Sequence, residues 1–124
     1  MFARLKKRRD FLLAAKGRKA PRRAFVLEGR RRDDDGPARF GFTVSKRVSK
    51  KAVERNRIRR RLREAARLLD AGQARPGHDY VLVGRRNALS GRFAGIAADL
   101  ANALREIPGL ASKRDRDGAR SSTR

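Results

Sequence analysis

The run KRVSKKAVERNRIRRRLREAAR at 46–67 is the part of this chain best suited to chemistry, and that chemistry is anion binding. Read as a helix, the run places an amide and several guanidinium groups along one face, about one turn apart. These residues are Asn56, Arg60, Arg63 and Arg67. A guanidinium donates a planar fork of hydrogen bonds to phosphate oxygens and stacks on bases, so such a row can follow a nucleic-acid backbone. A merely solvated face is disfavoured because like charges one turn apart destabilise a helix unless an anion neutralises them.

The remaining candidates for chemistry are one histidine and one acidic run. His78 precedes Asp79, but neighbouring side chains in an extended segment point apart, so we interpret His78 as a polar strand-start residue rather than a general base. The acidic run DDD at 33–35 precedes a Gly-Pro turn, and adjacent side chains on a loop rarely converge on a metal. We therefore predict no catalytic residue, no metal site and no small-molecule substrate for this chain.

The whole chain is strongly basic. Its 124 residues include 35 Lys and Arg against 13 Asp and Glu, which gives a formal net charge of +22. Such a charge attracts nucleic acid or an anionic membrane surface. No apolar run approaches the roughly 20 residues of a membrane span, and the N-terminal segment lacks the cleavage pattern of a signal peptide. We predict a nucleic-acid partner, no membrane partner and, with no cysteine in the chain, a cytoplasmic location.

Hydrophobic periodicity predicts the elements that carry these residues. We expect helices at 8–16, at 52–70 and from Ser90, as a cap, to Pro108, and we expect strands at 24–28, 39–45 and 79–84. Gly17 is expected to end the first helix, and 18–23 to be a basic connector. The predicted inward residues of the first two helices are Phe11, Leu12, Ala15, Ile58, Leu62, Ala65, Ala66 and Leu69.

This order of elements, αββαβα, predicts an α+β fold. We expect a single small domain at 1–110, in which helices pack on a central sheet. The segment 111–124 has no apolar periodicity and is predicted to be a disordered basic tail.

Several of these segments resemble the bacterial ribonuclease P protein subunit. The residues that match its signature are GFTVSKR at 41–47, Ala52, RNRIRR at 55–60, Leu62 and Arg63. The similarity extends to LKK at 5–7, Asp10-Phe11, FVL at 25–27 and DYV at 79–81, and covers roughly residues 4 to 106.

The resemblance implies a role beside a catalytic RNA. In that family an RNA subunit removes the 5′ leader of precursor transfer RNA by a Mg²⁺-dependent endonucleolytic hydrolysis. The protein binds the RNA and the leader but is inactive alone, the Mg²⁺ is held mainly by the RNA, and one protein per RNA is expected. A ribosomal-protein-like fold with a left-handed βαβ crossover through the basic helix is also implied.

The resemblance also assigns roles to residues of this chain. The expected contacts to the catalytic RNA are Lys46, Arg47, Lys50, Lys51, Arg55, Asn56, Arg57, Arg59, Arg60, Arg63 and Arg67. The expected contacts to the single-stranded leader are Phe11, Lys16, Phe25 and Phe42. Aromatic faces stack unpaired bases, although for each Phe a plain core position is an equal alternative.

The chain departs from the family pattern in three places. Ala15 and Glu28 stand where aromatic residues are frequent, and Ser49-Lys50 replaces the usual Gly-Asn before the basic helix. The first two changes predict a less aromatic leader cleft, and the third keeps positive charge but alters the turn before the helix.

A second class of function stays open on these residues. A structural rRNA-binding protein, a ribosome-assembly protein or a nucleoid DNA binder would share this composition. Recognition of a single-stranded leader separates the two classes, because a structural RNA binder needs no cleft for it.

Overall fold

A computed structural model describes residues 2–70 and 72–107 of the chain. At its centre lies a five-stranded sheet in the order β1-β4-β5-β3-β2. The strands are β1 (Ala3–Arg4), β2 (Arg18–Pro21), β3 (Phe25–Arg31), β4 (Arg39–Thr43) and β5 (His78–Gly84). β4 and β5 are parallel neighbours, which requires a crossover between them, whereas β3 runs antiparallel to β5. The predicted α+β class is therefore confirmed.

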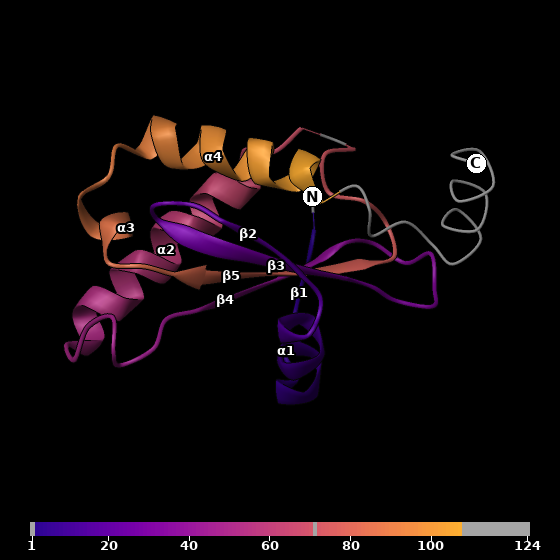
Figure 1. The fold of residues 1–124 in the computed structure, drawn as a ribbon, viewed down its shortest axis with the longest axis horizontal. Helices are drawn as coiled ribbons and strands as arrows, with labels where there is room; N and C mark the ends of the chain where they lie inside the picture. Colours follow the sequence, from indigo (N-terminus) through magenta and orange to yellow (C-terminus); the bar gives the residue numbers. More distant parts are fainter. Residues whose placement is uncertain (1, 71, 108–124) are drawn as a thin grey trace.

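Helices cover both faces of this sheet, as Figure 1 shows. They are α1 (Arg8–Ala15), α2 (Ala52–Arg67), the short α3 (Asn87–Ser90) and α4 (Phe93–Glu106). α2 and α4 pack together on one face, while α1 lies alone on the other. α2 is the crossover between β4 and β5, so the basic helix is positioned by the two central strands. The left-handed course of this crossover stays a prediction.

The main core lies between the sheet and the pair α2 and α4. Alternation along the strands places Phe40 and Leu82 on this face, where both are fully buried. Ile58 and Leu62 of α2 are also fully buried against them. The predicted apolar stripe of this helix is confirmed, with Leu69 only partly buried beyond its end. The core thus orients α2 so that its opposite face meets solvent.

Strands β1 and β2, the short helix α3 and several element boundaries differ from the sequence prediction. β3 is longer than predicted, while β4 and α2 end earlier. The segment predicted as a basic connector contains β2, which pairs with β3 at the edge of the sheet. Only Ala20 of this strand is buried, so its alternation is too short to be recognised. The two-residue β1 was not predicted either. The last helix begins at Phe93 rather than after Ser90, which instead ends α3, and its N-cap residue Arg92 makes no side-chain cap.

Gly17 has a different role from the one predicted. The residue at the C-cap of α1 is Lys16, and the positive-φ glycines of the described chain are Gly72 and Gly77. A Cβ atom on Gly17 would collide with the carbonyl oxygen of Gly29. Gly17 therefore permits the close approach of the chain after α1 to β3.

The inward face of α1 was predicted correctly for Phe11 and wrongly for Leu12 and Ala15. Ala14 is its buried residue, whereas Leu12 is 54% exposed and Ala15 is exposed. α1 contacts the sheet through a small cluster that includes Ala14, Leu5 and Val81. Because one narrow stripe of the helix meets the sheet, its other apolar residues line a surface beside it. The predicted tail at 111–124 lies outside the described residues.

Candidate nucleic-acid interface

The solvent-facing side of α2 forms the first basic surface. Asn56, Arg57, Arg60 and Arg67 are exposed there, and we call these four residues the crest. Lys46, Arg47, Lys50 and Lys51 are exposed in the segment that leads into the helix. The polar side chains of the crest are therefore accessible to a large polyanion. The predicted row is exposed at Asn56, Arg60 and Arg67, whereas its fourth member, Arg63, is half-buried.

Ser49 organises the start of this helix. It is buried, its hydroxyl donates to a carboxylate oxygen of Glu54 at 2.5 Å, and it accepts the backbone N–H of Lys51 at 3.2 Å. The Ser49 carbonyl also accepts a 2.8 Å hydrogen bond from Arg55. The hydrogen bond from Ser49, helped by the charge of Arg86, holds the pKa of Glu54 below its ordinary value. Ser49 thus ties the segment before α2 to the first turn of the helix, whose N-cap residue Lys51 makes no side-chain cap.

Arg59 and Arg63 lie on the side of α2 that turns toward β4, and we call this pair the flank. They line a groove together with Arg4, Lys6 and the aromatic rings of Phe11, Phe40 and Phe42. Arg59 and Arg63 are one helical turn apart and half-buried, which distinguishes them from the exposed crest. The basic residues of α2 therefore face two different surroundings.

A cleft lies between α1 and the face of the sheet on which α1 packs. Phe11 and Leu12 of α1 form one wall, and Val81 and Val83 of β5 lie on the sheet side. Lys6 and Arg8 bring positive charge to it. Phe11 and Phe42 line both the cleft and the groove beside the flank, so the two hollows adjoin each other.

The ring of Phe11 sits directly on β4 because residue 41 is glycine. A Cβ atom at position 41 would lie 2.5 and 2.6 Å from two ring carbons of Phe11. The absence of a side chain therefore sets how deeply this ring enters between α1 and the sheet.

We expect Gly41→Ala to push the Phe11 ring out of its seat while leaving the fold intact, because the ring is the movable end of a side chain. Its effect on ligands that contact Phe11 should have the same sign as that of Phe11→Ala and be smaller. Binding measurements on both variants, with thermal unfolding as the control for stability, check this. If Gly41→Ala bound these ligands with wild-type affinity, the position of the Phe11 ring on β4 would not matter for binding.

The structure separates the four residues predicted to bind the leader. Phe11 lines the cleft, Phe42 is partly buried at the boundary between cleft and groove, and Lys16 is exposed at the end of α1. Phe25 is fully buried in the main core, on the opposite face of the sheet. Its assignment to the leader is corrected, because a ring without exposed surface cannot stack on a base.

Glu28 lies in the cleft and is joined to α1 by a lysine. Its carboxylate accepts a 2.7 Å hydrogen bond from Lys19, whose ammonium also donates to the carbonyl oxygen of Ala15 at 2.7 Å. α1 has no basic residue of its own in the last turn, so Lys19 supplies the missing positive charge there. The bridge ties the C-terminal end of α1 to β3 and closes one end of the cleft.

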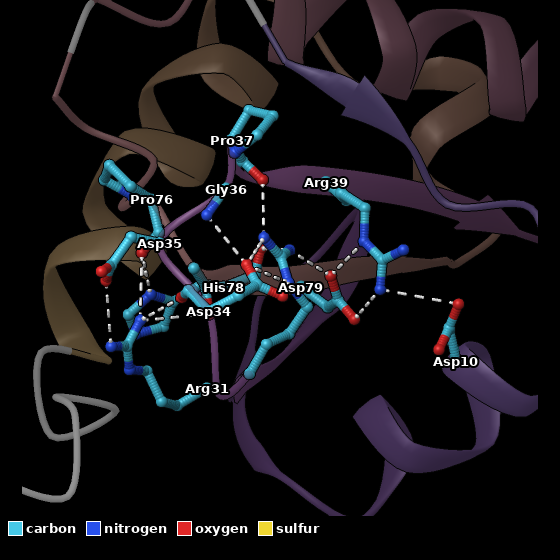
Figure 2. A network of polar contacts seen from close by, with 12 residues as sticks. Asp10, Arg31, Asp34, Asp35, Gly36, Pro37, Arg39, Pro76, His78 and Asp79 are labelled. Carbon is cyan, nitrogen blue, oxygen red and sulfur yellow. Dashed lines mark hydrogen bonds and ion pairs between the residues drawn. The ribbon is translucent and has the colours of Figure 1, made fainter.

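A second polar tie holds the N-terminal part of α1 (Figure 2). Arg39 donates two 2.8 Å hydrogen bonds to the two carboxylate oxygens of Asp79, and its Nη2 lies 3.5 Å from a carboxylate oxygen of Asp10 in α1. Arg32 adds a 2.7 Å hydrogen bond to the same Asp79. The Asp79 side chain is fully buried. Burial would raise its pKa, but the hydrogen bonds and charges of Arg39 and Arg32 outweigh burial and hold the pKa below its ordinary value.

The acidic run at 33–35 is engaged by arginines. Hydrogen bonds from Arg32 and then from the Gly36 backbone lower the pKa of Asp34 to about 2. Asp35 lies 3.6 Å from Arg31. Among the described residues, no three His, Cys, Asp or Glu side chains are grouped so that they could hold a metal ion.

His78 begins β5 and is buried beside the same network. Its Nδ1 lies 2.9 Å from the Pro76 carbonyl oxygen, and its ring stacks on Tyr80 at a centroid distance of 5.9 Å. The surroundings of His78 are thus those of a packed residue at the start of a strand.

Several of the residues that line the cleft and the groove were not identified from the sequence. Leu12, Val81 and Val83 are apolar and resemble core residues in sequence, and nothing local distinguishes Arg4 and Arg8 from the other cations. One signal was available in β5, which is apolar at successive positions and therefore needs packing on both faces of the sheet. The longer helices pack on only one face, so the short helix α1 has to pack on the other.

The domain is a small α+β fold that combines an exposed basic helix with a cleft lined by aromatic, aliphatic and cationic side chains. This combination is typical of an RNA-binding protein. The family model described as Ribonuclease P matches residues 2–108, and the chain belongs to this family.

Relatives and solved structures agree with this assignment. The ribonuclease P protein component of Gluconacetobacter diazotrophicus is 49% identical over 104 residues, which cover 83% of this chain and 89% of the relative. That of Caulobacter vibrioides is 47% identical over 124 residues, covering 99% and 80%. The RNase P protein of Staphylococcus aureus superposes with a TM-score of 0.69 at 26% identity, over 90% of this chain and all of that one. The Thermotoga maritima protein gives 0.68 at 30% identity, over 83% and 96%.

The chain is therefore a protein component of ribonuclease P, the ribonucleoprotein endoribonuclease of transfer RNA 5′ processing, and its partner is the ribonuclease P RNA. The structural rRNA-binding alternative is not favoured by these relationships. Within residues 2–70 and 72–107, no helix combines the length and the apolar character needed to cross a membrane.

Proposed function

We propose that this protein uses two adjoining surfaces for two RNAs, the crest of α2 for the catalytic RNA and the cleft beside α1 for the 5′ leader of precursor transfer RNA. The observation that carries the proposal is the pairing of an exposed basic helix with a cleft on the other face of the sheet. We place this assembly in the cytoplasm, with one protein per RNA.

The catalytic RNA is assigned to the crest because structured RNA offers closely spaced phosphates. Exposed guanidinium groups on a rigid helix hold such a backbone through paired hydrogen bonds. The other proposed contacts are Lys46, Arg47, Lys50, Lys51 and Arg55. Arg55 donates one hydrogen bond to the Ser49 carbonyl oxygen, so this side chain also stabilises the start of the helix.

The leader is assigned to the cleft because unpaired bases need flat or apolar surfaces, whereas their phosphates need cations. Phe11 offers a ring, Leu12 and Val83 extend the apolar surface, and Lys6 and Arg8 supply charge. Ala15 leaves this wall without a second ring, and Glu28 is neutralised by Lys19. Stacking in this cleft therefore depends mainly on Phe11.

The proposed role of the protein is binding and orientation rather than bond cleavage. Mg²⁺ supplies the metal-assisted hydrolysis in the proposal, but the described carboxylates do not form a site that fits it, and those of Asp34 and Asp79 are held by arginines. We propose that the RNA subunit holds the Mg²⁺, and we derive no step through it on this chain.

We expect Arg60→Ala to weaken binding of the catalytic RNA and to reduce the dependence of log K on log salt concentration by about one unit for each phosphate that the variant no longer neutralises. Filter binding of the protein to the catalytic RNA across salt concentrations measures both. Arg105→Ala, on an exposed arginine of α4, is the matched control and should leave the slope unchanged. An unchanged slope for Arg60→Ala would rule out the crest as the surface that binds this RNA.

A further inference from the structure

The groove beside the flank has cations on both of its walls. Arg4 and Lys6 lie on the β1 side, and Arg59 and Arg63 lie on α2. Its lining contains no carboxylate, and none of the four cations forms an ion pair with another described residue. The Nε atom of Arg63 is buried and has no hydrogen-bond partner among the described residues. Arg59 donates a hydrogen bond to the amide oxygen of Asn56 in the crest, which leaves its charge unneutralised. Four cations without an ion pair, together with the unused Nε donor of Arg63, indicate a missing anion.

The floor of the groove is an open edge of the sheet. β1 pairs with β4 only at Arg39 and Phe40. The outer edge of β4 at 41–43 therefore has no neighbouring strand in the part of the chain that the structure describes. Edge strands are normally covered or guarded by charge, because their backbone groups are free to pair. Here the guarding charges are all positive, which favours a polyanion as the cover.

The groove and the cleft form one path around this edge. Lys6, Phe11 and Phe42 line both hollows. A single RNA strand that passes from the ring of Phe11 over β4 therefore enters the groove directly. The groove has a volume of about 470 Å³, which is enough for a single nucleotide. The aromatic rings that the groove shares with the cleft favour single-stranded RNA over the structured catalytic RNA, because such rings stack on unpaired bases.

We propose that the groove binds the backbone of the precursor leader where it passes between the cleft and α2. The arginines of α2 are thereby divided, with the crest serving the catalytic RNA and the flank serving the leader together with Arg4 and Lys6. This changes the assignment of Arg59 and Arg63, which the family resemblance gives to the catalytic RNA. This inference rests on the proposed leader cleft and extends it to residues outside the cleft and to an opposite wall.

The test uses the reconstituted holoenzyme with Arg4→Gln and Arg63→Gln, because these two cations line the groove and not the cleft. Two probes are compared, a precursor transfer RNA with an unstructured oligouridine leader and the same transfer RNA without a leader. Each variant should weaken binding of the leader-bearing probe by roughly three- to tenfold and lower its salt slope by about one unit. Binding of the leaderless probe and of the catalytic RNA to each variant should stay unchanged.

Two further variants keep the result interpretable. Lys7→Gln removes an exposed neighbouring charge that does not line the groove, and it should leave the ratio of the two probes unchanged. Arg60→Gln should weaken the catalytic RNA without changing this ratio. If Arg4→Gln and Arg63→Gln leave the ratio unchanged while Phe11→Ala lowers it, the groove proposal is overturned and the cleft proposal stands. If none of the three lowers it, the proposed leader cleft fails as well.

Discussion

Replacing Asp79 with alanine is expected to lower the free energy of unfolding by about 3 to 5 kcal/mol. Asp79 is fully buried and accepts hydrogen bonds from Arg39 and Arg32 at 2.7 to 2.8 Å. Its removal leaves Arg32, whose side chain is 8% exposed, with Asp34 as its remaining carboxylate partner, and leaves Arg39 with the more distant Asp10. Urea unfolding of the wild type and Asp79→Ala measures the difference. Asp33→Ala, at an exposed position of the acidic run, is the control and should change stability by less than about 0.5 kcal/mol.

The same pair of proteins should differ in the dependence of stability on pH. The folded-state pKa of Asp79 is below its ordinary value, so its contribution is present above the unfolded-state pKa and is lost as pH falls through the folded-state pKa. The gap between wild type and Asp79→Ala should therefore narrow in acid. Equal stability of the two proteins near neutral pH would contradict the assigned network.

Phe11→Ala is expected to weaken binding of leader-bearing precursor by about 1 to 3 kcal/mol, the range typical of removing one aromatic stack on a base. The ring lines the cleft and sits on Gly41, in a region that the crest does not reach. Affinity for the catalytic RNA should stay unchanged, because the crest is intact. Binding of leader-bearing precursor and of mature transfer RNA to the reconstituted holoenzyme separates the two contributions.

The matched control for this prediction is Phe25→Leu. Phe25 is fully buried in the main core, so its truncation should reduce stability without changing the preference for a leader. If Phe11→Ala lowered the affinity for leader-bearing precursor and for mature transfer RNA equally, the role of Phe11 would be purely structural.

Periodicity predicted the parts of the fold that bury a long apolar stripe. α2 presents Ile58, Leu62 and two alanines at helical spacing, and these positions are buried as predicted. β2 buries Ala20 alone, and two-residue β1 has too few positions for any pattern. The short elements depend on pairing with distant strands, which local sequence does not encode.

The candidate site divides in the same way. The crest was predictable, because a charged helical face is local information. The cleft was not, because alternation in a strand does not say which face a short helix covers. Phe25 and Phe42 therefore looked equivalent in sequence, yet Phe25 lies in the core and Phe42 at the boundary of cleft and groove.

The central claim is that this protein contributes binding while the RNA contributes the chemistry. Cleavage of precursor transfer RNA at limiting Mg²⁺ by a bacterial ribonuclease P RNA, with and without this protein and beside the protein alone, tests it most directly. The account predicts stimulation of the RNA and no cleavage by the protein alone. Cleavage by the protein alone, or no stimulation of an RNA to which the protein is bound, would contradict it.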